Sequence, residues 1–270
     1  MENILQIDNL TIKFGGLTAV DEVSFYQKSG EILSLIGPNG AGKTTLFNLL
    51  TGVYSPTYGR ILFKDRNVTG LKAYERAQFG MARTFQNIRL FTGMTVLENV
   101  LVACPEVNGE GIFKSVFFRG KFNAQRRAAV EKAEGLLAVM GLEHQLETLS
   151  TNLSYGKQRL LEIARALATG PDLLLLDEPG AGMNSVEKEE LSSVIRHITA
   201  AMGKNVLIIE HDMKFVMGIS DRILVLDHGA KIAEGLPAEI QTNPLVIKAY
   251  LGSGSVAEEP GAPEEPGVSV

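Results

Sequence analysis

Hydrophobic and polar residues alternate along the first thirty positions of the chain. This spacing predicts short strands in an antiparallel or mixed sheet, because successive side chains of a strand point to opposite faces. Gly15 and Gly16 indicate a turn between two of these strands. A second strand pair is expected over residues 59–68, with its turn at residues 65–67. The chain therefore begins with a strand-rich segment.

Helical spacing of apolar residues replaces this alternation from Thr95 to about Leu149. Thr95 fits the N-cap of a helix, and Glu98 stands at the matching capping-box position. Another helix is expected over residues 123–140. Residues 105–122, which lie between the two, have little periodicity and therefore indicate a loop-rich insertion.

Two later apolar runs, at residues 173–176 and 206–209, are continuous rather than alternating. Such runs are typical of central parallel strands that are covered on both faces. A terminal hairpin is expected over residues 223–233, with its turn at residues 227–229. Residues 253–270 contain two pairs of glutamates and no Lys or Arg, which predicts a disordered acidic tail.

The composition excludes several classes of protein. A length of 270 residues suits one large domain or two small ones. The net charge of −5 argues against general electrostatic binding to nucleic acid. The single cysteine, Cys104, excludes an internal disulfide and is expected to be a small buried residue. We expect no secretory signal and no membrane-spanning segment, because no apolar run approaches the roughly 20 residues that a spanning helix needs.

Residues 37–45 carry the clearest chemical signal in the chain. Their sequence, GPNGAGKTT, matches the phosphate-loop pattern G-x-x-x-x-G-K-[ST] and stands between an apolar strand and a helix start. This context favours a phosphate site over a glycine-rich turn without a ligand. Backbone N–H groups of such a loop point at phosphate oxygens, Lys43 supplies a charge, and the Thr44 hydroxyl can bind Mg²⁺. The residues expected to hold the nucleotide are Gly37, Asn39, Gly40, Ala41, Gly42, Lys43, Thr44 and Thr45.

Acidic residues and a histidine follow two of the predicted parallel strands. Asp177 and Glu178 come directly after residues 173–176. We expect Asp177 to hold Mg²⁺ through water and Glu178 to act as general base on an attacking water. His211 follows residues 206–209, and its neutral imidazole can both donate and accept a hydrogen bond to orient that water. A histidine without this context is more often structural.

The order of these motifs resembles that of the ATP-binding cassette (ABC) ATPases. The sequence LSYGKQR at residues 153–159 resembles the family signature L-S-G-G-Q and stands between Gln86 and Asp177. The resemblance covers residues 1–252. It implies an α/β fold with a mixed or parallel sheet core around the phosphate loop, an N-terminal antiparallel β-subdomain and a helical subdomain. The implied helical subdomain spans about 87–168 and includes an insertion at about 105–126.

The resemblance also implies roles for individual residues. Phe14 stands where the family stacks an aromatic ring on adenine, and Gln86 where it has a glutamine that touches Mg²⁺ and water. Ser154 and Gly156 match signature residues that reach the γ-phosphate of ATP bound to the opposite subunit. His211 matches the switch histidine. Two cassettes would thus sandwich two ATP molecules head to tail, and binding and hydrolysis would close and open the pair.

Three positions depart from the family pattern. Tyr155 replaces the first glycine of the signature, and Lys157 stands where glutamine is usual. Asn184 stands where the family commonly has Asp, which keeps the hydrogen-bonding shape and loses the charge. We expect ATPase activity to survive these changes, because the signature contacts come from Ser154 and from the backbone of Gly156.

Residues 14–20, the signature with the helix behind it, and the insertion resemble the ATP-binding subunits of bacterial branched-chain amino acid importers. This implies work at the cytoplasmic face of the inner membrane, with permease subunits, a second cassette and an extracytoplasmic solute-binding protein as partners. Residues 88–100 would receive the permease, although core packing is the better interpretation for Leu97 and Val100. Residues 111–119 mix aromatic and basic residues, which fits either a membrane-proximal segment or a surface loop.

Other functions remain open from sequence alone. The same motor could serve urea, short amides, other amino acids or a lipid, because cassettes of this family do not touch the cargo. A soluble cassette that acts on nucleic acid or the ribosome is disfavoured by the negative charge and by the single cassette. A cassette without hydrolysis is disfavoured because Glu178 and His211 are both present.

Overall fold

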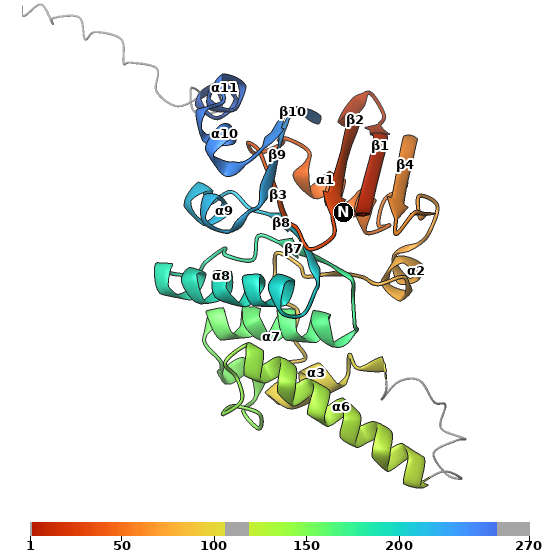
Figure 1. The fold of residues 1–270 in the computed structure, drawn as a ribbon, viewed down its shortest axis with the longest axis vertical. Coiled ribbons are helices and arrows are strands. Elements are labelled where there is room, and N and C mark those ends of the chain that lie inside the picture. The colour runs from red at the N-terminus through yellow and green to blue at the C-terminus, as the bar shows by residue number, and fades with distance from the viewer. Residues whose placement is uncertain (1, 106–118, 253–270) are drawn as a thin grey trace, which may run out of the picture.

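The computed structural model describes residues 2–105 and 119–252. Two sheets lie in its upper part as drawn, with short helices beside them, and the helices coloured yellow to teal lie below (Figure 1). The fold is the predicted α/β class, with one antiparallel sheet and one mostly parallel sheet. The predicted tail at 253–270 and most of the predicted insertion lie outside the described residues.

The first sheet is antiparallel and has the strand order β2-β1-β4-β5. Its strands are β1 (Asn3–Phe14), β2 (Leu17–Lys28), β4 (Tyr58–Phe63) and β5 (Arg66–Asn67). The prediction of short strands was wrong, because β1 and β2 each run for 12 residues. A register shift between Ile7 and Leu10, where Asn9 has a φ of 46°, lets β1 continue although its alternation is broken.

The predicted turn at residues 65–67 was also placed wrongly. Lys64 and Asp65 form the turn, with φ angles of 50° and 58°, and Arg66 already pairs with Phe63. Two consecutive residues with positive φ give a hairpin turn whose twist matches that of its strands. The strand therefore resumes one residue after Asp65.

The second sheet has the strand order β10-β9-β3-β8-β7-β6. All neighbouring pairs are parallel except β9 and β10, which form the expected terminal hairpin. Every residue of β3, β7 and β8 is buried, which explains their continuous apolar runs. The strands are β3 (Ile32–Ile36), β6 (Met81–Arg83), β7 (Leu173–Asp177), β8 (Asn205–Ile209), β9 (Arg222–Asp227) and β10 (Ala230–Gly235).

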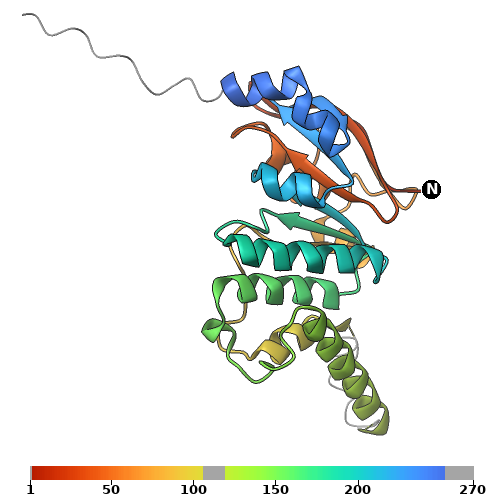
Figure 2. The same ribbon diagram turned by 60° about the vertical axis from the view of Figure 1, so that its left-hand side comes forward.

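Helices cover both faces of the second sheet. Leu173 and Leu175 of β7 share a core with α1 (Lys43–Leu50) and the antiparallel sheet, whereas Leu174 and Leu176 face the helical side. On that side, α7 and α8 are stacked on the sheet, and α3 and α6 lie beyond α7 (Figure 2). These helices are α3 (Val96–Leu101), α6 (Arg119–Val139), α7 (Tyr155–Ala168) and α8 (Ser185–Ala200).

The remaining helices are short. They are α2 (Ala73–Gln78), α9 (Met213–Ile219), α10 (Pro237–Thr242) and α11 (Pro244–Gly252), with a 3₁₀ turn, η1 (Ser150–Asn152). A small separate core joins β9 and the end of β3 to α9, α10 and α11. None of the helices among the described residues is long and apolar enough to cross a membrane.

The start of α3 has the predicted capping box. The Thr95 hydroxyl accepts the Glu98 N–H at 3.2 Å, and the Glu98 carboxylate accepts the Thr95 N–H at 2.9 Å. Val100 is buried and Leu97 packs against the same core, as expected for both. Cys104 is buried, as predicted. The predicted end of the insertion at residue 122 was wrong, because the first turn of a helix needs no core-facing periodicity and α6 already begins at Arg119.

Candidate functional site

The phosphate loop connects the end of β3 to the start of α1. Its glycines are required by close packing as well as by backbone angles. A Cβ atom on Gly37 would lie 2.1 Å from the Leu226 carbonyl oxygen, and one on Gly42 would lie 2.5 Å from that of Ala19. Gly42 has a φ of 95° and is the N-cap of α1. The loop is therefore held between the end of β9 and β2 in a shape that only glycine permits.

Lys43 lies at the centre of this loop. Its ammonium group donates to the carbonyl oxygens of Gly37 at 2.7 Å and Pro38 at 2.9 Å. Burial lowers the pKa of Lys43, and the negative charge of Glu178 raises it in part. A largely buried cation whose hydrogen bonds go to neutral carbonyl oxygens provides a strong attraction for a phosphate group.

A cavity of about 500 Å³ opens over the loop. All the predicted loop residues from Asn39 to Thr45 line it, whereas Gly37 does not and contributes its carbonyl oxygen to Lys43. Its other lining residues are Leu17, Thr18, Ala19, Glu178, His228 and Gly229. The cavity thus joins the loop to the predicted general base.

Phe14 ends β1 and pairs in register with Leu17, whose side chain lines the cavity. The Phe14 ring is 45% exposed and meets the Tyr54 ring edge to face, with the centroids 5.4 Å apart. An exposed aromatic face beside a phosphate site can stack on a nucleobase.

The three predicted catalytic residues meet at one carboxylate oxygen. The Gln86 amide donates to Glu178 Oε2 at 3.1 Å, and His211 Nδ1 lies 3.6 Å from the same atom. Glu178 has a φ of 46°, and its N–H donates to the Ile209 carbonyl at 2.9 Å. The ends of β7 and β8 therefore bring Glu178 and His211 together, with Glu178 in a strained backbone conformation of the kind found at functional sites.

The predicted metal ligands are Thr44, Gln86 and Asp177. Asp177 is almost fully buried, and its Oδ2 accepts from Arg83 Nη2 at 2.6 Å. The candidate donors are all side-chain oxygens, which are the ligands that Mg²⁺ prefers. Among the described residues, no group of three or more His, Cys, Asp or Glu is placed to hold a metal.

Two contributors to the site were missed by sequence reasoning. Arg83, which binds Asp177, stands three residues before Gln86, but nothing in the sequence indicates which residue is its partner. Glu210 is buried and accepts backbone N–H groups from Gly180 at 2.8 Å and His211 at 3.0 Å. It thereby joins the turn after β7 to the one after β8. The sequence signal that could have identified Glu210 is its place between the end of β8 and His211.

Ser154 and Gly156 do not line the phosphate-loop cavity. They stand at the N-terminus of α7, where the Ser154 hydroxyl accepts the Lys157 N–H at 3.4 Å. A Cβ on Gly156 would lie 2.7 Å from the Glu187 carboxylate, so a larger residue does not fit without displacing Glu187.

The three departures from the signature pattern have structural partners. The Lys157 ammonium group donates to Gln145 at 2.9 Å, and Tyr155 is exposed beside Gly182. Asn184 is the N-cap of α8, and its side chain accepts two backbone N–H groups, as the Asp usual at this position also could.

Comparisons with known proteins agree with this geometry. The model of the family "ABC transporter" matches residues 20–181, and "Branched-chain amino acid ATP-binding cassette transporter" matches residues 230–256. The high-affinity branched-chain amino acid transport ATP-binding protein LivG of Salmonella typhimurium is 47% identical over 249 residues. That match covers 92% of this chain and 98% of LivG.

Solved structures give the same result. The ADP conformation of MJ1267, an ATP-binding cassette of an ABC transporter, superposes with a TM-score of 0.80 at 33% identity, over 93% of this chain and 100% of that one. A dimeric post-hydrolysis state of the cassette MJ0796, bound to ADP and Pi, superposes with a TM-score of 0.70 at 26% identity, over 86% and 98%. The chain therefore belongs to the ABC transporter ATP-binding proteins, a family of nucleotide-binding ATPase cassettes, and within it to the branched-chain amino acid transport group.

Proposed function

We propose that this chain is the ATP-hydrolysing motor of an importer for branched-chain amino acids. The observation that carries the catalytic part is the meeting of Gln86 and His211 at Glu178, on the wall of the phosphate-loop cavity. The cargo is supported by the match of residues 230–256 and by the similarity to LivG.

ATP would bind with its adenine on Phe14 and its phosphates in the loop formed by residues 39–45. Lys43 would turn from the Gly37 and Pro38 carbonyl oxygens toward the β- and γ-phosphates. Thr44, Asp177 and Gln86 would hold Mg²⁺, which neutralises phosphate charge when bound. Arg83 Nη2 donates to Asp177 Oδ2 at 2.6 Å and thereby holds this carboxylate in place.

Glu178 would then accept a proton from the water that attacks the γ-phosphate. Gln86 and His211 would orient this water, because each can offer a hydrogen bond within reach of the Glu178 carboxylate. The work of these residues is chiefly positioning and electrostatics, as is usual in phosphoryl transfer.

The site requires a second cassette. Ser154 and Gly156 lie outside the cavity, at the N-terminus of the 14-residue helix α7, where backbone N–H groups and the helix dipole favour an anion. They would meet the γ-phosphate held by the partner subunit, in a homodimer or a heterodimer. The dimeric MJ0796 structure supports such an arrangement.

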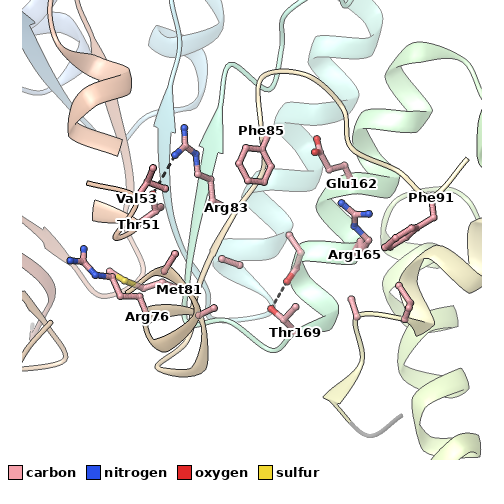
Figure 3. Close-up of a pocket in the computed structure, with 16 residues that line it drawn as sticks. Thr51, Val53, Arg76, Met81, Arg83, Phe85, Phe91, Glu162, Arg165 and Thr169 are labelled. Atoms are coloured by element: carbon pink, nitrogen blue, oxygen red, sulfur yellow. Dashed lines mark hydrogen bonds between the residues drawn. The ribbon is translucent and has the colours of Figure 1, made fainter. Parts of the chain in front are cut away.

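A cavity of about 460 Å³ between α2, β6 and α7 offers a docking place for a permease subunit (Figure 3). Phe85 and Phe91 from the segment after β6 line it together with Glu162 and Arg165 of α7. Arg165 lies over the Phe91 ring, 5.4 Å from its centroid. We infer that a short helix of the permease binds here, which would place the chain at the cytoplasmic face of the inner membrane, and that an extracytoplasmic solute-binding protein delivers the cargo.

Copurification from native membranes tests the proposal. A tagged chain should retain two hydrophobic permease subunits and a second cassette, as identified by mass spectrometry. A matched preparation with the tag alone is the control. If permeases of a urea, amide or lipid system copurify, the chain is still the motor of an importer, but its cargo is not a branched-chain amino acid. Ribosomal proteins or nucleic acid in place of permeases would overturn the transport assignment.

A further inference from the structure

A fully buried ion pair lies in the second turn of α7. Arg159 Nη1 and Glu162 Oε2 are 2.8 Å apart, and their side chains are 0% and 2% exposed. Removing two charges from water costs free energy that their attraction often fails to recover. Stability alone is therefore a weak reason for the pair, and its other contacts indicate its role.

Both side chains bind the backbone of the segment that carries Gln86. Arg159 donates to the carbonyl oxygens of Phe85 at 2.6 Å and Gln86 at 2.7 Å. Glu162 Oε1 accepts the Arg89 N–H at 3.2 Å. Burial raises the pKa of Glu162, while Arg159 and the backbone N–H groups of Arg89 and Phe85 lower it.

This segment has little other regular support. Residues 84–94 belong to no helix or strand, and the Gln86 side chain is exposed. The two carbonyl groups held by Arg159 flank the Gln86 Cα, so the guanidinium fixes where the Gln86 side chain begins. From there, the Gln86 amide reaches Glu178.

We infer that Arg159, held by Glu162, is a positioning residue that ties Gln86 to the signature helix. The inference rests on the proposed role of Gln86 in hydrolysis. Ser154 and Gly156 begin the same helix. Any displacement of α7 therefore moves the signature and the Gln86 backbone together, so that the water-orienting amide is in place only when the signature is.

The test is a double-mutant cycle on the ATPase activity of the full chain, purified in complex with its partner cassette and permease subunits. Arg159→Lys keeps the charge, but an ammonium group lacks the planar fork that reaches two carbonyls and a carboxylate together. We expect kcat to fall by about tenfold to a hundredfold, since misplacing a catalytic group by about 1 Å has effects of this size. The KM for ATP should stay within about twofold, because Arg159 does not line the phosphate-loop cavity.

The cycle distinguishes positioning from general stability. If Arg159 acts through Gln86, its loss has no further effect once the Gln86 side chain is gone. Arg159→Lys should then lower the kcat of a Gln86→Ala protein by no more than about twofold, which is the usual uncertainty of such a cycle. Glu162→Gln removes the charge that holds Arg159, and its effect on kcat should likewise disappear in a Gln86→Ala protein. This variant replaces Arg159→Lys in the test if Arg159→Lys fails to fold. Full multiplication of the losses in the double variants would overturn the inference. Unchanged kcat in Gln86→Ala alone would instead overturn the proposed role of Gln86.

A matched control uses Arg222, a second arginine of the described residues that combines a carboxylate partner with a backbone carbonyl. Arg222 binds Glu31 at 2.7 Å and the Tyr26 carbonyl at 2.6 Å, at the start of β9. Arg222→Lys should lower the unfolding temperature, yet keep kcat within about twofold in both the wild-type and the Gln86→Ala background. A loss of kcat in this control equal to that in Arg159→Lys would mean that general destabilisation explains both.

Discussion

Replacing Glu178 with Gln removes the proposed general base while leaving its surroundings in place. The amide oxygen can still accept the hydrogen bond from Gln86, which now reaches the carboxylate at 3.1 Å. The side-chain volume and the positive φ at this position are unchanged. The variant therefore isolates the loss of one charge and one proton acceptor.

The expected loss of kcat is about 100- to 10,000-fold, the usual contribution of a positioned general base. This corresponds to about 2.7 to 5.4 kcal/mol in the activation barrier. ATP affinity should be unchanged or higher, because a negative charge leaves the wall of a cavity that binds a polyanion. The loss should therefore fall on kcat and not on KM.

The assay measures phosphate release for kcat and titration with a fluorescent ATP analogue for Kd. Glu131→Gln is the matched control, since Glu131 is exposed on α6 and outside the phosphate-loop cavity, and it should behave as wild type. A Glu178→Gln protein with a kcat within tenfold of wild type would refute the catalytic assignment. A large loss of ATP affinity would show that Glu178 supports the loop instead.

Three further predictions concern binding and stability. Phe14→Ala should weaken ATP binding by about 1 to 3 kcal/mol, the value of one base–aromatic stack, while Phe14→Tyr keeps the affinity in the same titration. Thr95→Ala should lower the free energy of unfolding by about 1 kcal/mol in urea denaturation because it removes the N-cap of α3, and Thr95→Ser should restore it. Two hydrogen bonds, one from the Lys188 ammonium group and one from the Phe215 N–H, lower the pKa of Asp212. Its carboxylate thus stabilises the fold above the unfolded pKa of about 3.9, and this contribution is lost as pH falls through the folded pKa. Asp212→Asn keeps the N-cap of α9 and should lower the free energy of unfolding by less than about 1 kcal/mol at pH 7. The difference from wild type should vanish in acid. A difference that does not change with pH would contradict an ionic origin.

Local features of the fold could be predicted because their causes are local. The buried parallel strands β7 and β8, the capping box of α3 and the phosphate loop each depend on a few consecutive residues. The long β1 could not be predicted, since its bulge at Asn9 breaks the alternation that identifies a strand. The start of α6 was missed for the similar reason that its first turn needs no periodic packing.

The residues of the site also fall into those that could be predicted from the sequence and those that could not. Lys43, Glu178 and His211 could be named because each follows or sits within a recognisable strand-end motif. Arg83 with Asp177, Glu210 with Gly180, and Arg159 with Gln86 could not, because each pair joins residues at least 30 positions apart. The sequence contains these charged residues but does not say which partner the fold brings to them.

We propose that ATP hydrolysis by this chain drives uptake of branched-chain amino acids. The most direct test of this proposal is the uptake of radiolabelled leucine by cells whose only copy of this chain carries Glu178→Gln, compared with cells carrying the wild type at equal protein level. Leucine uptake through this system should be lost in the variant, while the assembled complex is still recovered from membranes. Undiminished leucine uptake in the variant cells would contradict the proposal.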